Sequence, residues 1–78
     1  MALELDDQRR DALVRGLQGL YLSDFEEELS TFRAEQVLDY FLATLGPQVY
    51  NQAVQDARVF MQRKLEDLDG EVYLPEQV

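Results

Sequence analysis

The pattern of apolar and polar positions along the chain predicts α-helices. Apolar residues recur at intervals of three and four, which places them on one side of a helix. The first predicted helix spans about residues 7–22 and follows Asp6 and Asp7, either of which can cap it. The second spans about 32–45. Because it is apolar over most of its circumference, we expect it to be the central, buried helix.

The dipeptide Gly46-Pro47 predicts the end of the second helix and the start of a third. Glycine supplies the left-handed residue that follows many helices, and proline is favoured at a first helical position. The third helix then spans about 47–68 and is followed by a short extended tail, 69–78. The expected fold is therefore all-α, with residues 1–78 forming a single small three-helix domain with a C-terminal tail.

The third predicted helix is longer than the second and should extend past it. At 1.5 Å per residue it measures roughly 30 Å, against roughly 21 Å for the second helix. Its projecting end carries apolar side chains that another segment has to cover, namely Phe60, Met61, Leu65 and Leu68. The first helix, the C-terminal tail and a second copy of the chain are the alternatives.

The chain is short for a stable monomer, since a domain of this size buries only about 60–65% of its unfolded surface. Small domains usually depend on disulfides, a metal or a partner subunit. This chain contains no Cys and no His, so a disulfide and a structural zinc site are excluded. We therefore expect a homo-oligomer, most simply a symmetric dimer, and neither a cofactor nor a metal.

A self-association surface is predicted from residues that do not fit the solvated sides of their helices. A strip of small side chains, which another backbone can approach closely, runs along the first helix through Ala12, Gly16, Gly19 and Ser23. The alternative is that this strip is a solvated flank without a role. Isolated apolar residues on polar sides, and one in the tail, complete the predicted surface: Tyr40, Val59 and Tyr73.

The charge of the chain disfavours several partners. Its 16 acidic and 7 basic side chains give a net charge of −9, which opposes binding to nucleic acid or to an anionic membrane. No apolar run reaches the roughly 18 residues that span a bilayer. The charged N-terminus lacks the apolar segment of a signal peptide, so we expect a cytoplasmic protein.

No catalytic site is predicted. Without His or Cys, proton transfer near neutral pH requires a carboxylate or Lys with a shifted pKa, and Asp56 is the best such acid. Together with Tyr50 and Asn51 it forms the most distinctive polar group. This group can bind a small ligand between helices, but we favour a structural role, in which it pairs backbone groups at the start of the third helix. The acidic run 66–71 lacks the ligand spacing of a calcium-binding loop.

Several short strings occur in a recognisable order: Leu38-Asp39-Tyr40-Phe41-Leu42, Gly46-Pro47, Tyr50-Asn51-Gln52-Ala53, Asp56-Ala57 and Lys64-Leu65-Glu66-Asp67-Leu68-Asp69. In these strings the chain resembles an uncharacterised bacterial family, the domain-of-unknown-function family numbered 2164, and a weaker similarity extends to the first helix. The chain departs from it at the first cap, where family members have Leu-Ser before an acidic pair. The resemblance implies a coherent small domain and no known activity.

The sequence therefore favours a non-enzymatic protein-interaction module that self-associates through helical faces or docks onto another protein. One alternative is a small transcription- or antitoxin-type regulator whose basic patch is masked by the net charge. The other is a small-ligand binder that uses the polar group around Tyr50, Asn51 and Asp56.

Overall fold

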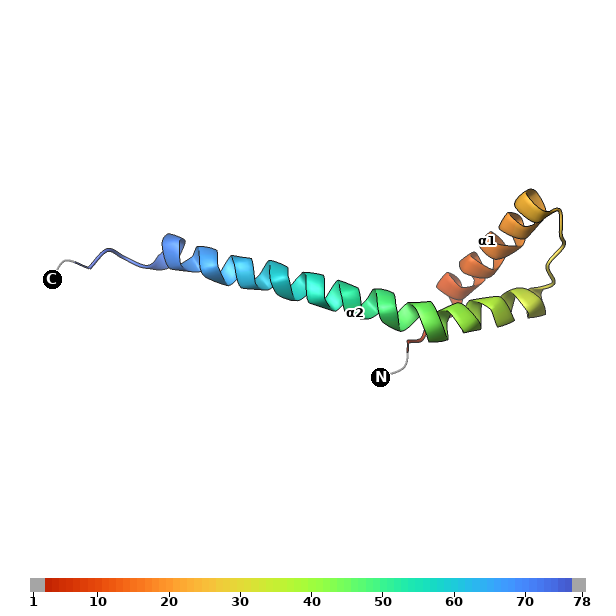
Figure 1. Ribbon diagram of the computed structural model, residues 1–78, viewed down its shortest axis with the longest axis horizontal. Coiled ribbons are helices and arrows are strands. Elements are labelled where there is room, and N and C mark those ends of the chain that lie inside the picture. The colour runs from red at the N-terminus through yellow and green to blue at the C-terminus, as the bar shows by residue number, and fades with distance from the viewer. Residues whose placement is uncertain (1–2, 77–78) are drawn as a thin grey trace. The chain divides into compact units, whose positions relative to one another are not determined.

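The computed structural model describes residues 3–76, which form two α-helices and no strand. Helix α1 spans Asp7–Phe25 and α2 spans Thr31–Val72 (Figure 1). The chain divides into two compact units, Met1–Gln48 and Val49–Val78. The first part of α2 belongs to one unit and the remainder to the other.

The all-α class agrees with the prediction, but the prediction of three helices is wrong. Helix α2 continues through Gly46-Pro47, so the predicted second and third helices are a single helix. No described glycine has a positive φ. Proline disfavours a helical residue before it because its ring contacts that residue's Cβ. Since Gly46 has no Cβ, the residue that predicted a break removes part of the obstacle to continuing the helix.

The predicted tail is also shorter than expected. Helix α2 includes Asp69-Gly70, a dipeptide typical of turns, and it ends only at Val72. A non-helical segment follows from residue 73 to residue 76. The last two residues of the predicted tail, 77 and 78, lie outside the described part of the chain.

Local capping explains where α1 begins and ends. Asp6, one of the two predicted caps, is the N-cap, and its Oδ1 accepts a 2.8 Å hydrogen bond from the backbone N–H of Arg9. At the other end Glu26 adopts the left-handed conformation, with φ 52° and ψ 35°. The backbone N–H of Glu27 then donates a 3.1 Å hydrogen bond to the carbonyl of Tyr21. The chain therefore leaves the helix three residues later than the predicted end at Leu22.

A second cap starts α2 at the predicted place. The Oγ of Ser30 accepts a 3.2 Å hydrogen bond from the backbone N–H of Arg33. The linker before it is fixed by Leu29, whose side chain is only 7% exposed and whose carbonyl accepts a 3.0 Å hydrogen bond from Gln18 of α1. The linker and α1 are thus both tied to the first part of α2.

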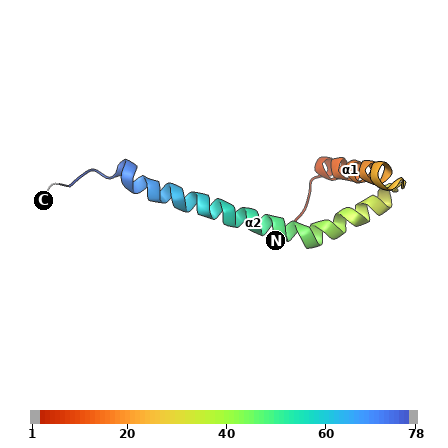
Figure 2. The same ribbon diagram turned by 45° about the horizontal axis from the view of Figure 1, so that its top comes forward.

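The buried core lies where α1 runs beside the first part of α2 (Figures 1 and 2). It is small, and its buried members are Val14, Leu29, Ala34 and Leu38. Half-buried apolar side chains surround it: Leu5, Leu17, Tyr21 and Leu42. In the other unit, by contrast, all residues from 49 to 76 are exposed.

Candidate functional site

The second half of α2 carries an apolar stripe that no described residue of the chain covers. We define the stripe by seven residues at successive spacings of four, three, four, four, three and four: Tyr50, Val54, Ala57, Met61, Leu65, Leu68 and Val72. These spacings average about 3.7 residues, close to one turn of an α-helix, so the seven side chains fall within about a quarter of its circumference. Met61, Leu65 and Leu68 are 59%, 62% and 47% exposed.

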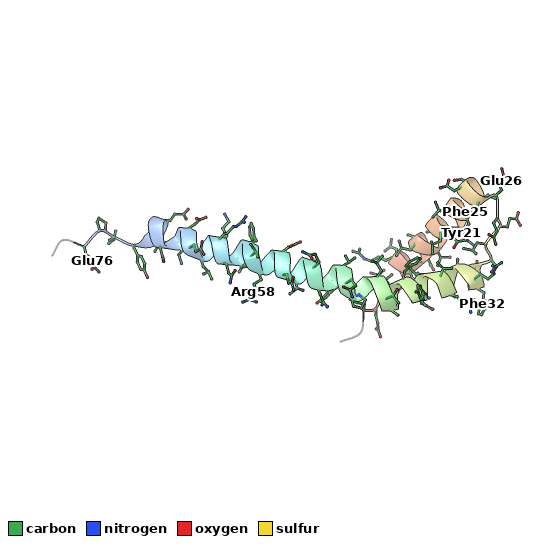
Figure 3. All side chains as sticks on the ribbon, in the orientation of Figure 1. Tyr21, Phe25, Glu26, Phe32, Arg58 and Glu76 are labelled. Carbon is green, nitrogen blue, oxygen red and sulfur yellow. The ribbon has the colours of Figure 1, made fainter. Side chains whose placement is uncertain are left out.

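Charged side chains border the stripe on both sides. Arg58, which projects from α2 in Figure 3, lies on one flank together with Asp69. Asp67 and Glu71 lie on the other flank. Lys64 lies on the same flank as Asp67 and Glu71, next to the stripe, and its Nζ lies 5.7 Å from the centre of the Phe60 ring. Its stem therefore runs along apolar surface while the ammonium group remains in solvent.

Ion pairs in the described residues lie in the first unit. Arg10 Nη2 is 2.7 Å from Asp39 Oδ1, and this contact joins α1 to α2. The hydrogen bond to Asp39 raises the pKa of Arg10 above its usual value. Arg33 Nη2 lies 3.7 Å from Glu27 Oε1. The charges that border the stripe make no ion pair within the described chain, which leaves them available to a partner.

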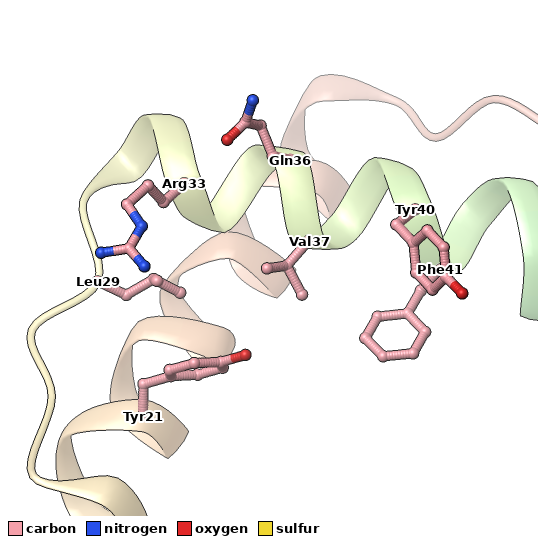
Figure 4. Close-up of a pocket in the computed structure, with 7 residues that line it drawn as sticks. All are labelled: Tyr21, Leu29, Arg33, Gln36, Val37, Tyr40 and Phe41. Atoms are coloured by element: carbon pink, nitrogen blue, oxygen red, sulfur yellow. The ribbon is translucent and has the colours of Figure 1, made fainter.

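A shallow groove is the second candidate site, and it lies entirely in the first unit. Its volume is about 440 Å³. Figure 4 shows it between Tyr21 of α1 and one side of α2, with Arg33 at one end and the Tyr40 and Phe41 rings at the other. Its remaining lining residues are Leu29, Gln36 and Val37. Tyr40, predicted as a surface contact, thus contributes to an apolar depression.

The other residues of the predicted surface are spread over different positions. Gly16 and Gly19 are exposed on α1, and a Cβ added at either would meet nothing within 4 Å. Val59, 45% exposed, lies on the opposite side of α2 from Met61. Tyr73 follows the end of α2 and is 76% exposed. The stripe, rather than this set, is the larger continuous apolar surface of the second unit.

The three side chains of the predicted polar group, Tyr50, Asn51 and Asp56, do not lie together on one side of α2. Asn51 and Asp56 are five residues apart, so the helix directs their side chains to different sides. Asp56 Oδ1 accepts a 3.0 Å hydrogen bond from Nε2 of Gln52, one turn earlier in the same helix. Tyr50 belongs to the stripe and is 42% exposed. The three side chains therefore do not converge on one point within this helix.

The described residues contain neither a cluster of metal-binding side chains nor a membrane-spanning helix. Between residues 3 and 76, no cluster of three or more acidic side chains is placed to hold a metal ion. Neither described helix contains a segment of the length and apolar character needed to cross a membrane.

Comparison with known proteins places the chain in a family. The family model of the uncharacterised conserved proteins DUF2164 matches residues 3–76. The chain is a member of the DUF2164 family. This confirms the resemblance inferred from the strings around Gly46-Pro47 and Tyr50, and the DUF2164 match covers both α1 and α2. No curated protein and no solved structure matches the chain.

Three of the four apolar residues that the sequence places on the projecting end of the third predicted helix belong to the stripe: Met61, Leu65 and Leu68. The excess length of that helix over the second is the signal that indicates they need cover. Sequence spacing shows which side of a helix is apolar, and it does not show what covers that side. It therefore leaves the first helix, the tail and a second copy as alternatives.

Proposed function

We propose that this protein is a non-enzymatic interaction module that self-associates through the apolar stripe of α2. The observation that carries the proposal is the exposure of the stripe, because large contiguous apolar patches on a soluble protein typically mark interaction surfaces. Met61 and Leu65, at its centre, are both more than half exposed. Burying them against another chain would remove apolar surface from water.

The small core supports the same proposal. A helix in water gains most of its stability from packing its apolar face, and propensity contributes less. The four buried residues among positions 3–76 all lie before Pro47, so they do not stabilise residues 49–76 by packing. A second copy supplies an identical apolar face, and a two-fold axis lets the same residues serve both chains.

The chemistry of the chain favours binding over catalysis. It contains neither His nor Cys, the side chains that most often carry out proton transfer and nucleophilic attack. The most distinctive polar residues, Tyr50, Asn51 and Asp56, do not converge. A surface that recognises another helix requires only complementary shape and charge, and the stripe with its charged flanks can offer both.

Sedimentation equilibrium of the full chain across the micromolar range tests the proposal. We expect a mass that rises from monomer to dimer with concentration, together with a helical circular-dichroism signal that falls on dilution. Met61→Glu should shift the equilibrium to monomer. Since Met and Glu have similar helix propensities, the change acts on the surface more than on the helix.

Val59→Glu is the matched control, because it introduces the same side chain two residues away on the opposite side of α2. It should leave the mass unchanged if the stripe is the interface. A monomer at every concentration, with a helical signal that does not respond to dilution, would contradict self-association.

A further inference from the structure

From Arg58 onward the charges of α2 are segregated, although Asp56 precedes them. The basic residues come first, at Arg58, Arg63 and Lys64, and four acidic residues follow within the next two turns: Glu66, Asp67, Asp69 and Glu71. Beside the stripe, Arg58 and Lys64 therefore come before Asp67, Asp69 and Glu71, since Arg63 and Glu66 lie on the opposite side of α2. The relative direction of two paired stripes decides which of these charges meet.

A parallel pair would bring like charges together. In parallel helices at the same register, each flank faces the opposite flank of the partner at the same height. Asp69 would then face the partner's Asp67 and the partner's Glu71. Like charges across an interface are destabilising, and this repulsion would occur twice in a symmetric pair.

An antiparallel pair reverses this relationship. A two-fold axis perpendicular to the helices places each flank beside the same flank of the partner, running in the opposite direction. Arg58 and Asp69 share one flank, while Lys64 and Asp67 lie on the other. The basic residues beside each stripe then lie along the acidic residues beside the partner's stripe.

Resting on the proposed self-association, we propose that the partner is a second copy paired antiparallel, with the two-fold axis passing between Lys64 and Leu65. In this register the residue numbers of two opposed positions add up to 129. Met61 therefore lies opposite the partner's Leu68, and Ala57 lies opposite the partner's Val72. Leu65 meets its own copy near the axis. All of these are stripe residues, so the apolar surfaces coincide from Ala57 to Val72, and the stripe residues Tyr50 and Val54 lie outside the overlap.

The same register brings opposite charges together on the Arg58 flank, whereas the other flank also holds a like-charged pair, Asp56 and the partner's Glu71, whose positions add up to 127. Arg58 lies within about 3 Å, measured along the axis, of the partner's Asp69, since the two positions add up to 127 instead of 129. Lys64 and the partner's Asp67 are offset by a similar distance in the other direction. On this flank each Lys64 lies about 1.5 Å, along the axis, from the partner's Lys64 and about 3 Å from the partner's Asp67. Attraction and repulsion both occur there, so the contact of Arg58 with the partner's Asp69 carries the charge argument. Because the stripe repeats at about 3.7 residues, the paired helices should coil slightly to the right, opposite in hand to the left-handed coil of a 3.5-residue repeat.

Disulfide cross-linking of the full chain tests direction and register, because the natural chain has no Cys. Leu65→Cys should cross-link to itself under mild oxidation. Ala57→Cys should not cross-link to itself, because the partner's residue 57 would lie opposite residue 72. The two cysteines would then be fifteen residues, or roughly 22 Å, apart along the axis, whereas a disulfide requires Cα atoms within about 7 Å. A mixture of Ala57→Cys and Val72→Cys chains should form the mixed disulfide.

Charge exchange provides a second, non-covalent test. Asp69→Arg should weaken the dimer roughly tenfold, because it replaces attraction by repulsion at two symmetric sites. Combining it with Arg58→Asp should restore most of the affinity. Arg15→Asp on α1 changes the net charge by the same amount as Arg58→Asp and should leave the dimer unchanged.

The outcomes separate this inference from the proposed function. A dimer in which Ala57→Cys cross-links to itself would show a parallel pair and overturn the inference alone. A dimer in which neither Leu65→Cys nor the mixed pair cross-links would overturn the register. A monomer by sedimentation would overturn both proposals.

Discussion

Nη2 of Arg10, on α1, donates a 2.7 Å hydrogen bond to Oδ1 of Asp39, on α2, across 29 residues of sequence. The side chain of Arg10 is 27% exposed, so this pair is better shielded from solvent than the local pair between Arg9 and Asp6, where the Arg9 side chain is 77% exposed. The bond links the two helices at the edge of the small core. It is therefore a point at which charge contributes to the fold of the first unit.

Asp39→Asn should lower the free energy of unfolding, because the amide keeps the shape of the carboxylate but loses its charge. The loss should shrink at high salt, which screens exposed charges. Urea unfolding at low and high ionic strength measures both effects. Arg9→Gln, which removes a more exposed partner, should change stability less. An Asp39→Asn chain as stable as the parent at low salt would contradict the role of this pair.

The core of the first unit should be sensitive to loss of volume. Leu38 is only 6% exposed, and Leu38→Ala should lower the free energy of unfolding by about 2–4 kcal/mol through lost burial and a residual cavity. Leu22 is 57% exposed, so Leu22→Ala should cost less than about 0.5 kcal/mol. Chemical denaturation of both variants gives the comparison, and equal losses would show that the core lies elsewhere.

The two glycines of α1 should tolerate a methyl group. Since nothing lies within 4 Å of a Cβ at Gly16 or Gly19, Gly16→Ala and Gly19→Ala should each stabilise the helix by up to about 1 kcal/mol. Thermal unfolding monitored by circular dichroism measures this gain. If the strip of small residues instead packs against a partner backbone, the same variants should weaken association, which sedimentation would detect.

Proline inside α2 should limit its stability. Pro47 has no N–H and lies in the interior of the helix, where proline costs about 3 kcal/mol relative to alanine. Allowing for the greater flexibility of the unfolded variant, Pro47→Ala should raise the free energy of unfolding by about 1–3 kcal/mol and increase the helical signal. A decrease would indicate that Pro47 begins a separate helix, as the sequence pattern had predicted.

Local signals predicted some features of the fold well. The first helix begins where Asp6 offers a cap, and the second begins after Ser30, because capping depends on a few neighbouring residues. The interruption at Gly46-Pro47 was predicted wrongly, because each residue was assessed by its usual role. In combination, the missing Cβ of Gly46 relieves the constraint that Pro47 imposes.

The candidate site was harder to predict, because it exists only where no other segment of the chain packs against the apolar side of α2. Spacing placed Met61, Leu65 and Leu68 on one side of a helix, and this follows directly from the sequence. Whether that side is covered depends on segments distant in the chain, and no local pattern encodes their position. The interaction roles of Gly16, Gly19, Tyr40, Val59 and Tyr73 remain predictions.

The placement of the basic residues in the second half of α2 has a further consequence, for digestion by trypsin, which cleaves after Arg and Lys. Beyond residue 48 the chain contains only Arg58, Arg63 and Lys64 as cleavage points. All three lie in the segment of α2 along which a second copy would run. Because pairing should suppress the local unfolding that cleavage requires, the rate at which the acidic C-terminal fragment is released should fall as protein concentration rises. Protease resistance would thus report chain pairing without any label.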